Sequence, residues 1–345
     1  MTPHRLAAPV AGYKAVARLY NALMTGLVLT LVTRKGTEDA RRFVFAHFRR
    51  QHLEKFLPGL RKLGLDKLPH AVACAQYHYF SNALGGVKTE YMPQSDRKAW
   101  VRYPPPRWIW AGTAICGIPC EVNEAMLHGW HGHNGVSLGN PRLGFVCTGQ
   151  TVEGDPGLEG YYLEYDRDLA PEERVRFATD EHAPRFVPAK APMLDMATWP
   201  EERRIKVERS YAMEYVRSML PTMVALFGAD EAGALVGRAA RLIGLQFHEG
   251  TAELLGMDST DADGFAACLA ALAVAQGEDV ALRRENDVPT VVQQGWRLMD
   301  GIALPEPALF RAWNALWEGA LAAHNRDLRL VTEREGGTIV WRIES

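Results

Sequence analysis

The chain repeats one pattern of helices, glycine stops and strands in its two halves, and this repetition constrains the fold more than any other feature. A long helical pattern ends at Gly64-Leu65-Asp66, and 192 residues later another ends at Gly256-Met257-Asp258. The dipeptide His133-Asn134 recurs 191 residues later as His324-Asn325. A near-constant offset indicates an internal duplication, in which each copy is one structural unit that must bury its apolar face.

The order of elements within each copy predicts the fold class. Residues 41–63 and 232–255 have apolar side chains at helical spacing, and the glycine after each is typical of a helix end. Each half closes on an alternating, strand-like run, at residues 161–165 and 339–343. Helices followed by strands favour an α+β fold over alternating βαβ units. We therefore expect two homologous halves, each with helices followed by a small, mostly antiparallel sheet, packed as a pseudo-dimer.

Prolines mark the boundary between the copies. Five of them lie within residues 171–204, a density that a long regular helix does not tolerate. The segment is therefore predicted to be a linker or a strap across the surface. The expected divisions are residues 1–170 as the first repeat and candidate active half, 171–204 as the Pro-rich linker, and 205–345 as a degenerate, mainly structural second repeat.

Composition limits the protein class and its location. Hydrophobic residues make up 47% of the chain and charged residues 23%, as in ordinary soluble domains. The five cysteines are an odd number in a long chain, which favours free thiols in a reducing compartment. The apolar run at residues 19–33 is shorter than the roughly 20 residues that span a bilayer. We expect a buried first helix in a cytoplasmic protein. The alternative is an interfacial helix at a membrane surface, with its basic neighbours facing anionic lipid: Arg34, Lys35, Arg41, Arg42, Arg49 and Arg50.

Charge raises nucleic acid as a partner. Residues 1–110 hold 18 basic and 6 acidic side chains, a net charge of +12, whereas the whole chain carries −2. The acidic second half balances this charge, and no nucleic-acid recognition motif is present. We expect a small-molecule substrate and no nucleic acid, and a homo-oligomer stays open.

Residues 100–134 concentrate unusual side chains. Glycines in the run 127–135 disfavour a continuous helix, so its histidines can converge from a turn. These histidines could be catalytic, substrate-binding, metal-ligating or structural, and the sequence does not decide among the four roles. It requires no cofactor; zinc or iron are the ions that imidazole ligands would suit. The histidines are His128, His131 and His133, and the neighbouring aromatic candidates are Trp108, Trp110 and Trp130.

A predicted hairpin places two further candidates opposite each other. Extended runs flank the polar turn at residues 94–98, with Glu90 on one side and Arg102-Tyr103 on the other. Glu90 and Arg102 either form a salt bridge or line a pocket in which Arg102 binds a substrate carboxylate through its forked donors. In the second case Tyr103 donates a proton.

A buried helix face is predicted near the end of the first helical region. Cys74, Tyr77 and His78 are spaced three and four residues apart, which places them on one face. We expect His78 to be a core histidine with its hydrogen bonds satisfied.

Each copy resembles the L-2-amino-thiazoline-4-carboxylic acid hydrolase-like family, a small bacterial group of α+β proteins. The resemblance lies in the helix ending Gly-Leu-Asp, the extended WVRYPPP at residues 100–106, the helix leading to His133-Asn134, and the Gly154-Asp155 turn before the last strand. It implies the α+β fold and a hydrolase. The family's cysteines are replaced by Tyr103 and, after the Gly-Asp turn, by Glu159 and Gly160. A hydrolase of this kind needs other catalytic groups.

These observations together predict a hydrolase acting on a C–N or ring bond of a small aromatic or heterocyclic, anionic substrate. His131 or His133 is the expected general base, with Tyr103 or Cys116 assisting. Substrate-binding candidates are Arg102, Trp108, Trp110, Trp130, Asn134 and Glu90, which would form an aromatic pocket with a few polar groups. The alternatives are a non-catalytic binding or sensor module, and a lyase, isomerase or metal-dependent enzyme that uses the three histidines.

Overall fold

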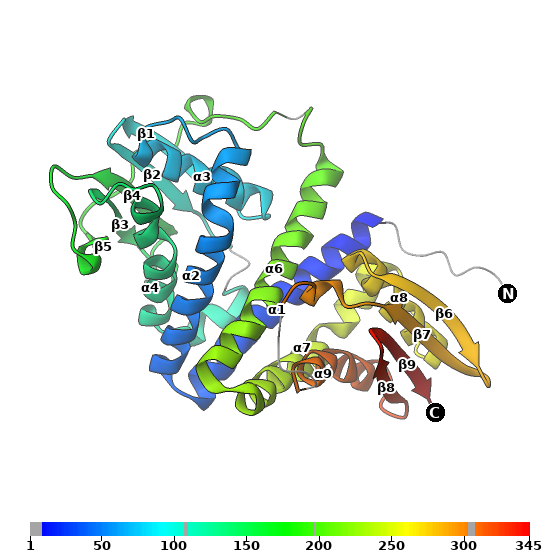
Figure 1. Cartoon of the computed structure of the whole chain (residues 1–345). Helices are drawn as coiled ribbons and strands as arrows, with labels where there is room; N and C mark the ends of the chain where they lie inside the picture. Colours follow the sequence, from blue (N-terminus) through cyan, green and yellow to red (C-terminus); the bar gives the residue numbers. More distant parts are fainter. Residues whose placement is uncertain (1–8, 107–109, 196, 303–307) are drawn as a thin grey trace. The chain divides into compact units, whose positions relative to one another are not determined.

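The computed structural model describes residues 9–106, 110–195, 197–302 and 308–345, and the chain divides into two compact units. The first, here called the central unit, comprises Leu31–Arg204. The second, called the split unit, joins Met1–Thr30 to Ile205–Ser345. Each contains helices and one sheet (Figure 1), which confirms the predicted α+β class.

The central unit places helices against a mixed sheet of five strands. The strand order is β1-β2-β4-β3-β5, and all pairs are antiparallel except β3 with β5. The predicted hairpin is present as β1 and β2. The elements are α2 (Thr37–Lys62), α3 (His70–Leu84), β1 (Glu90–Ser95), β2 (Lys98–Tyr103), α4 (Cys120–Gly129), α5 (Asn134–Ser137), β3 (Leu143–Gly149), β4 (Leu158–Glu164) and β5 (Val175–Phe177).

The split unit repeats this order of elements. Its sheet runs β6-β7-β9-β8, wholly antiparallel, which matches β1-β2-β4-β3 strand for strand. A common strand order is what a duplication requires. The elements are α1 (Pro9–Arg34), α6 (Glu201–Phe227), α7 (Ala229–Leu255), α8 (Ala262–Gln276), β6 (Asp279–Glu285), β7 (Val288–Gln294), α9 (Ala308–His324), β8 (Arg329–Glu335) and β9 (Thr338–Glu344).

The glycine stops lie where the sequence predicts them. Gly64 follows α2 with φ of +71°, and Gly256 follows α7 with φ of +68°. Only glycine adopts this left-handed conformation without a steric penalty, and in it the residue ends the helix.

The first thirty residues differ from the sequence-based division. The sequence places them in the first repeat, whereas in the structure residues 9–30 group with residues 205–345. The physical reason is burial of α1: Tyr20 is inaccessible to solvent and donates a hydrogen bond to Gln276 of α8, while Trp313 of α9 donates to Tyr20. The α1 helix is also longer than the apolar run suggested. Among the described helices, α1 has the length and composition to cross a membrane, yet 67% of its most apolar window is buried in the protein.

The two faces of the central sheet are covered by different parts of the chain. Successive side chains of a strand point to opposite faces. Tyr161 therefore lies with Trp100 on one face, where Phe186 from the Pro-rich segment packs on them. Tyr162 lies with Phe145 on the other face, against His78 of α3. The segment 171–204 thus acts as a strap and also supplies β5.

Candidate functional site

The hairpin candidates form an ion-pair cluster. Glu90 lies directly opposite Arg102, whose Nε donates to Glu90 Oε2 at 2.7 Å. Arg102 Nη1 lies 3.6 Å from Glu159 Oε2 on the neighbouring strand. The salt bridge, one of the two alternatives, is therefore present. Two carboxylates surround this guanidinium, so its charge is compensated within the protein.

The other candidates from the same stretch are scattered. Trp108 lies outside the described residues. Trp110 is buried and donates to Asn123 Oδ1 at 3.1 Å, whereas Cys116 is exposed at the end of a short 3-10 helix. Tyr103 is buried on the α3 face of the sheet, with its ring centroid 6.5 Å from that of His131. Trp130 lies beside His52, Tyr77 and His78, and the aromatic pocket expected from the sequence stays a prediction.

Asn134 is the centre of a buried polar cluster in the central unit. It is inaccessible to solvent, and its Nδ2 donates to Tyr162 Oη at 2.7 Å and to His78 Nε2 at 3.2 Å. Its Oδ1 lies 3.1 Å from His52 Nε2. Tyr162 in turn lies 2.7 Å from His131 Nδ1. Four elements thus meet at one amide, because α2, α3, the 131–137 turn and β4 each contribute one of these side chains.

The direction of every hydrogen bond in this cluster follows from Arg49. Arg49 Nη1 lies 2.8 Å from His52 Nδ1, and arginine can only donate. His52 Nδ1 is therefore the acceptor, so its Nε2–H donates to Asn134. Asn134 donates to Tyr162, and Tyr162 donates to His131. The result is one ordered chain from a half-exposed guanidinium to a buried imidazole.

Burial lowers the pKa of two histidines of this cluster, His52 and His78. It lowers the pKa of His52 to about 3, with a further contribution from the charge of Arg49. Burial also lowers the pKa of His78 to about 3. The rings of His78 and His131 stack with centroids 4.1 Å apart, an arrangement that suits two uncharged imidazoles. His78 is thus a satisfied core histidine, as its helical spacing predicts.

The three histidines of the 127–135 run point to different partners. His131 is buried and bonds to Tyr162, while His133 Nδ1–H donates to the backbone carbonyl of His128 at 2.9 Å. Within the ranges that the structure describes, no group of three or more histidine, cysteine or acidic side chains is arranged to hold a metal ion.

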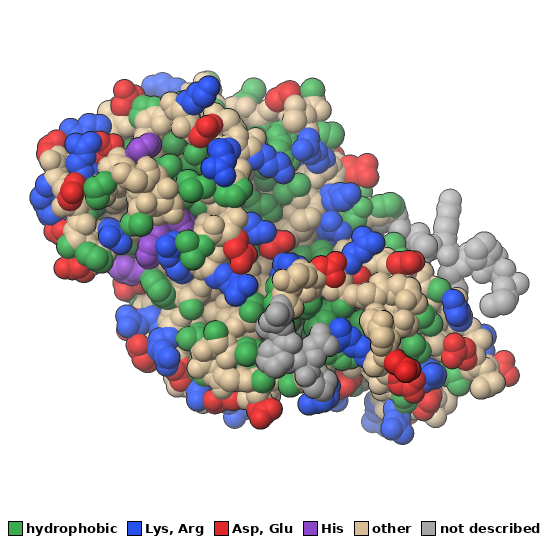
Figure 2. All heavy atoms as spheres, viewed as in Figure 1, with side chains coloured by type: hydrophobic (Ala, Val, Ile, Leu, Met, Phe, Trp, Pro, Cys, Tyr) green, Lys and Arg blue, Asp and Glu red, His purple; other side chains and the backbone are tan. Residues whose placement is uncertain are grey.

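His133 lies beside two arginines and one exposed aromatic ring, and the nearby His128 lies beside a second ring. The His133 ring centroid is 6.1 Å from that of Phe45, and the His128 ring is 6.3 Å from Phe177. Both phenylalanines are about 40% exposed, at 39% and 40%. Figure 2 shows histidine side chains at the surface among hydrophobic and basic ones. We call the following set the arginine–histidine patch: Phe45, Arg49, His128, His133, Arg174 and Phe177.

Among the described residues no carboxylate is ion-paired with the two arginines of this patch, whereas the charge of Glu124 acts on His128. None of the ion pairs found among the described residues includes Arg49 or Arg174. The pKa of Arg49 is lowered by burial and then by the charge of Arg174. The pKa of His133 is lowered by burial and by both arginines, although its bond to His128 raises it. Like charges held together cost free energy unless an anion compensates them.

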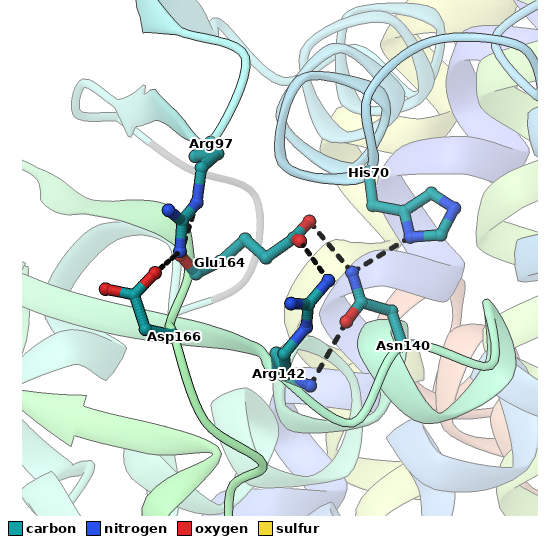
Figure 3. Close-up of polar contacts among 6 residues, drawn as sticks. All are labelled: His70, Arg97, Asn140, Arg142, Glu164 and Asp166. Atoms are coloured by element: carbon teal, nitrogen blue, oxygen red, sulfur yellow. Dashed lines mark hydrogen bonds and ion pairs between the residues drawn. The ribbon is translucent and has the colours of Figure 1, made fainter.

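A second polar cluster in the same unit is compensated. Asn140 donates to His70 Nδ1 and to Glu164, and Arg142 Nη2 bonds to the other oxygen of Glu164 at 2.8 Å (Figure 3). Arg97 bonds to Asp166 at 2.7 Å beside them. Two arginines here meet two carboxylates. This cluster ties the 138–142 loop to α3 and β4, and it leaves no charge for a ligand.

Two of the thiols, Cys120 and Cys147, are poor candidates for nucleophiles. Cys120 accepts a hydrogen bond from Gln150, but burial and the nearby Glu153 and Glu124 raise its pKa to about 12. Cys147 is buried, and its pKa is also raised to about 12 by burial. A thiol of this kind stays protonated at neutral pH, and the thiolate is the reactive form.

The His-Asn pair of the second half has a different environment. His324 Nδ1 accepts from His248 Nε2 at 3.0 Å, since its own Nε2–H donates to the backbone carbonyl of Asp261. Asn325 donates to the carbonyl of Thr260 near the surface. Asn134 therefore has no buried amide counterpart at Asn325, although the two dipeptides align in sequence.

The residues that sequence reasoning missed are His52, Arg49, Arg174 and Tyr162. His52 lies four residues from Phe48 and from Phe56, on the buried face of α2, and this spacing was a usable signal. Arg174 gave no signal, because only folding brings it to the 131–137 turn, where its Cβ lies 3.8 Å from the position of a Cβ on Gly132.

A comparison of the chain with protein-family models finds no match, and a comparison with curated proteins finds none either. The resemblance described from the sequence therefore stays an expectation.

Proposed function

We propose that the central unit is a hydrolase acting on a C–N or ring bond of a small aromatic or heterocyclic anion, bound at the arginine–histidine patch. The observation that carries this proposal is the pair Arg49 and Arg174, which lie beside His133 and form no ion pair with a carboxylate of the described residues. Arginine forks bind planar anions, and exposed rings such as Phe45 and Phe177 suit an aromatic substrate.

His133 is the general base of the proposed reaction. Its Nδ1–H is held by the His128 carbonyl, so the lone pair is at Nε2. Burial and the two arginines lower the pKa of His133, which keeps the ring neutral at pH 7. Nε2 takes a proton from water, and the resulting hydroxide attacks the carbon of the C–N bond. The proton then passes from His133 to the leaving nitrogen as that bond breaks.

This assignment changes the roles expected from the sequence. Arg102 is compensated by Glu90 and Glu159, so the proposal transfers the anion-binding role to Arg49 and Arg174. It keeps His133 as the base and gives no direct role to Cys116 or Tyr103. We also infer a cytoplasmic location, because the cysteines are free and α1 is mostly buried.

A non-catalytic binding module is the second candidate. The observation that favours it is the lowered pKa of His133, because a lower pKa also makes a weaker base. Both candidates require anion binding at the patch, and only the hydrolase requires turnover.

The test has two stages. Binding of benzoate is measured by calorimetry for the native protein, Arg49→Gln, Arg174→Gln and the control Arg50→Gln. Arg50 is the next residue of α2 and is ion-paired with Glu54 at the surface. Each patch variant should weaken binding about tenfold, the loss of one charge-assisted contact. Aromatic amides and heterocyclic carboxylates are then screened for turnover, and His133→Gln should abolish any activity found. Equal weakening by Arg50→Gln would remove the patch from the proposal.

A further inference from the structure

The acceptor that holds Arg49 is unusual, because it is a neutral imidazole. Arg49 Nη1 donates to His52 Nδ1 at 2.8 Å, and His52 itself is 1% exposed. Three other arginines of the central unit are held by carboxylates: Arg97 by Asp166, Arg102 by Glu90, and Arg142 by Glu164. A carboxylate orients a guanidinium and also cancels its charge. An imidazole nitrogen orients it and leaves the charge intact.

The His52 imidazole is fixed in the tautomer whose Nδ1 can accept the hydrogen bond from Arg49. His52 Nε2–H is engaged by Asn134 Oδ1, so the proton is kept away from Nδ1. The orientation of Asn134 is fixed in turn, since its Nδ2 donates to Tyr162 and His78. The His52 ring is also clamped by packing, stacked on Phe56 with centroids 4.9 Å apart. The side chains behind Arg49, namely His52, Asn134 and Tyr162, carry no charge that would compete with Arg49 for the anion.

We propose that His52 and Asn134 are positioning residues, which hold the Arg49 guanidinium in place for an anionic ligand without neutralising it. This inference rests on the proposed function in one respect: the anionic ligand of Arg49 is the anionic group of the proposed substrate. It gives the buried histidine chain, including His131, a positioning role in place of the catalytic role expected for His131 from the sequence.

Two substitutions at His52 separate this role from simple packing. Gln in His52→Gln keeps a neutral acceptor for Arg49 and a donor for Asn134. Phe in His52→Phe keeps the ring that stacks on Phe56 but removes both hydrogen bonds. Benzoate binding is measured by calorimetry for each variant, after circular dichroism shows that it is folded. We expect binding about tenfold weaker in His52→Phe, and within about twofold of the native protein in His52→Gln.

Equal benzoate affinities of His52→Phe and the native protein would overturn the inference while leaving the proposed function in place. So would a His52→Gln variant that binds benzoate more weakly than His52→Phe, since the packing of the ring would then matter more than its hydrogen bonds. A second readout covers the case in which the native protein does not bind benzoate. The guanidinium resonances of Arg49 are compared by NMR; they should be ordered in the native protein and in His52→Gln, and averaged by motion in His52→Phe. If the Arg49 guanidinium is ordered in the native protein but the protein does not bind benzoate, the proposed function is overturned and the positioning role is kept. Motional averaging in the native protein would overturn the positioning role.

Discussion

The hydroxyl of Tyr162 donates a hydrogen bond to Nδ1 of His131 across 2.7 Å, and on its other side it accepts a hydrogen bond from Nδ2 of Asn134. The phenol therefore links two side chains of the 131–137 turn from a strand that is distant in sequence. Burial raises the pKa of Tyr162 far above its ordinary value, so the hydroxyl stays protonated and keeps this direction.

Tyr162→Phe should destabilise the central unit. The change leaves His131 Nδ1 and one N–H of Asn134 without partners in the core, which costs about 1–3 kcal/mol. Urea denaturation measures the loss. Tyr161→Phe is the matched control, because its hydroxyl bonds to the partly exposed Glu181, where water can replace it. A smaller effect for Tyr162→Phe than for Tyr161→Phe would contradict the hydrogen-bond chain.

Stability should fall as the solution is acidified below pH 6.5. Burial lowers the pKa of His47, His52 and His78 from 6.5 to about 3 in the folded protein. Between these values the unfolded chain binds protons that the folded protein does not, so acid favours unfolding. Their neighbours Arg50 and Arg49 act in the same direction.

The size of this effect follows from the linkage relation. From pH 6.5 to pH 5, each neutral histidine costs the folded state about 2 kcal/mol. Urea denaturation at pH 7.5 and at pH 5 measures the total. His47→Phe removes one of these groups and should reduce the difference between the two pH values. Equal stability at both pH values would mean that these imidazoles are protonated in the folded protein.

Arg174→Gln should raise the pKa of His133. The positive charge of Arg174 disfavours the protonated ring, so its removal relieves that repulsion. The ring is titrated by NMR in both proteins. The pKa of the neighbouring His128 is shifted by the charges of Glu124 and Arg41, which the substitution leaves in place. As a control, Arg176→Gln removes a charge two residues away whose guanidinium bonds to Tyr165. An equal shift of the His133 pKa in the control would mean that the effect is not specific to the patch.

Gly244→Ala should destabilise the split unit strongly. A Cβ on Gly244 would lie only 2.0 Å from the carbonyl oxygen of Leu316, where α7 crosses α9. The two backbones must then separate, at a cost of at least about 3 kcal/mol. Gly237→Ala is the control in the same helix, because its nearest neighbour is at an ordinary 3.5 Å. That change should stabilise the helix by up to about 1 kcal/mol. Thermal denaturation distinguishes them, and similar melting temperatures would mean that the helices do not cross so closely.

Local patterns in the sequence were enough for the fold class and for several elements. The helix ends at Gly64 and Gly256 and the hairpin of Glu90 with Arg102 depend on neighbours in sequence or on a short turn, so spacing alone predicts them. The repeat predicted two sheets of similar construction. It could not predict that α1 would leave its own copy, because burial of Tyr20 depends on Gln276.

The candidate site was harder to predict, since its members come from separate elements. His133 was identified from its glycine-rich surroundings. Arg174 lies in a Pro-rich segment whose composition suggests only a strap, and β5 brings it into position by pairing with β3. Trp108 and Trp110 attracted attention as rare residues, but rarity does not determine where a side chain points. Trp110 is used for a buried hydrogen bond to Asn123.

The hydrogen bond between Tyr20 and Gln276 joins residues 256 positions apart. During synthesis α1 therefore emerges from the ribosome well before its partners, since α8 and α9 lie far downstream in the chain. The central unit, by contrast, is continuous in the chain and is complete by Arg204. Throughout that interval α1, an apolar helix long enough to cross a membrane, is without its packing partners, so the nascent chain exposes to chaperones and membranes a segment that the finished protein buries.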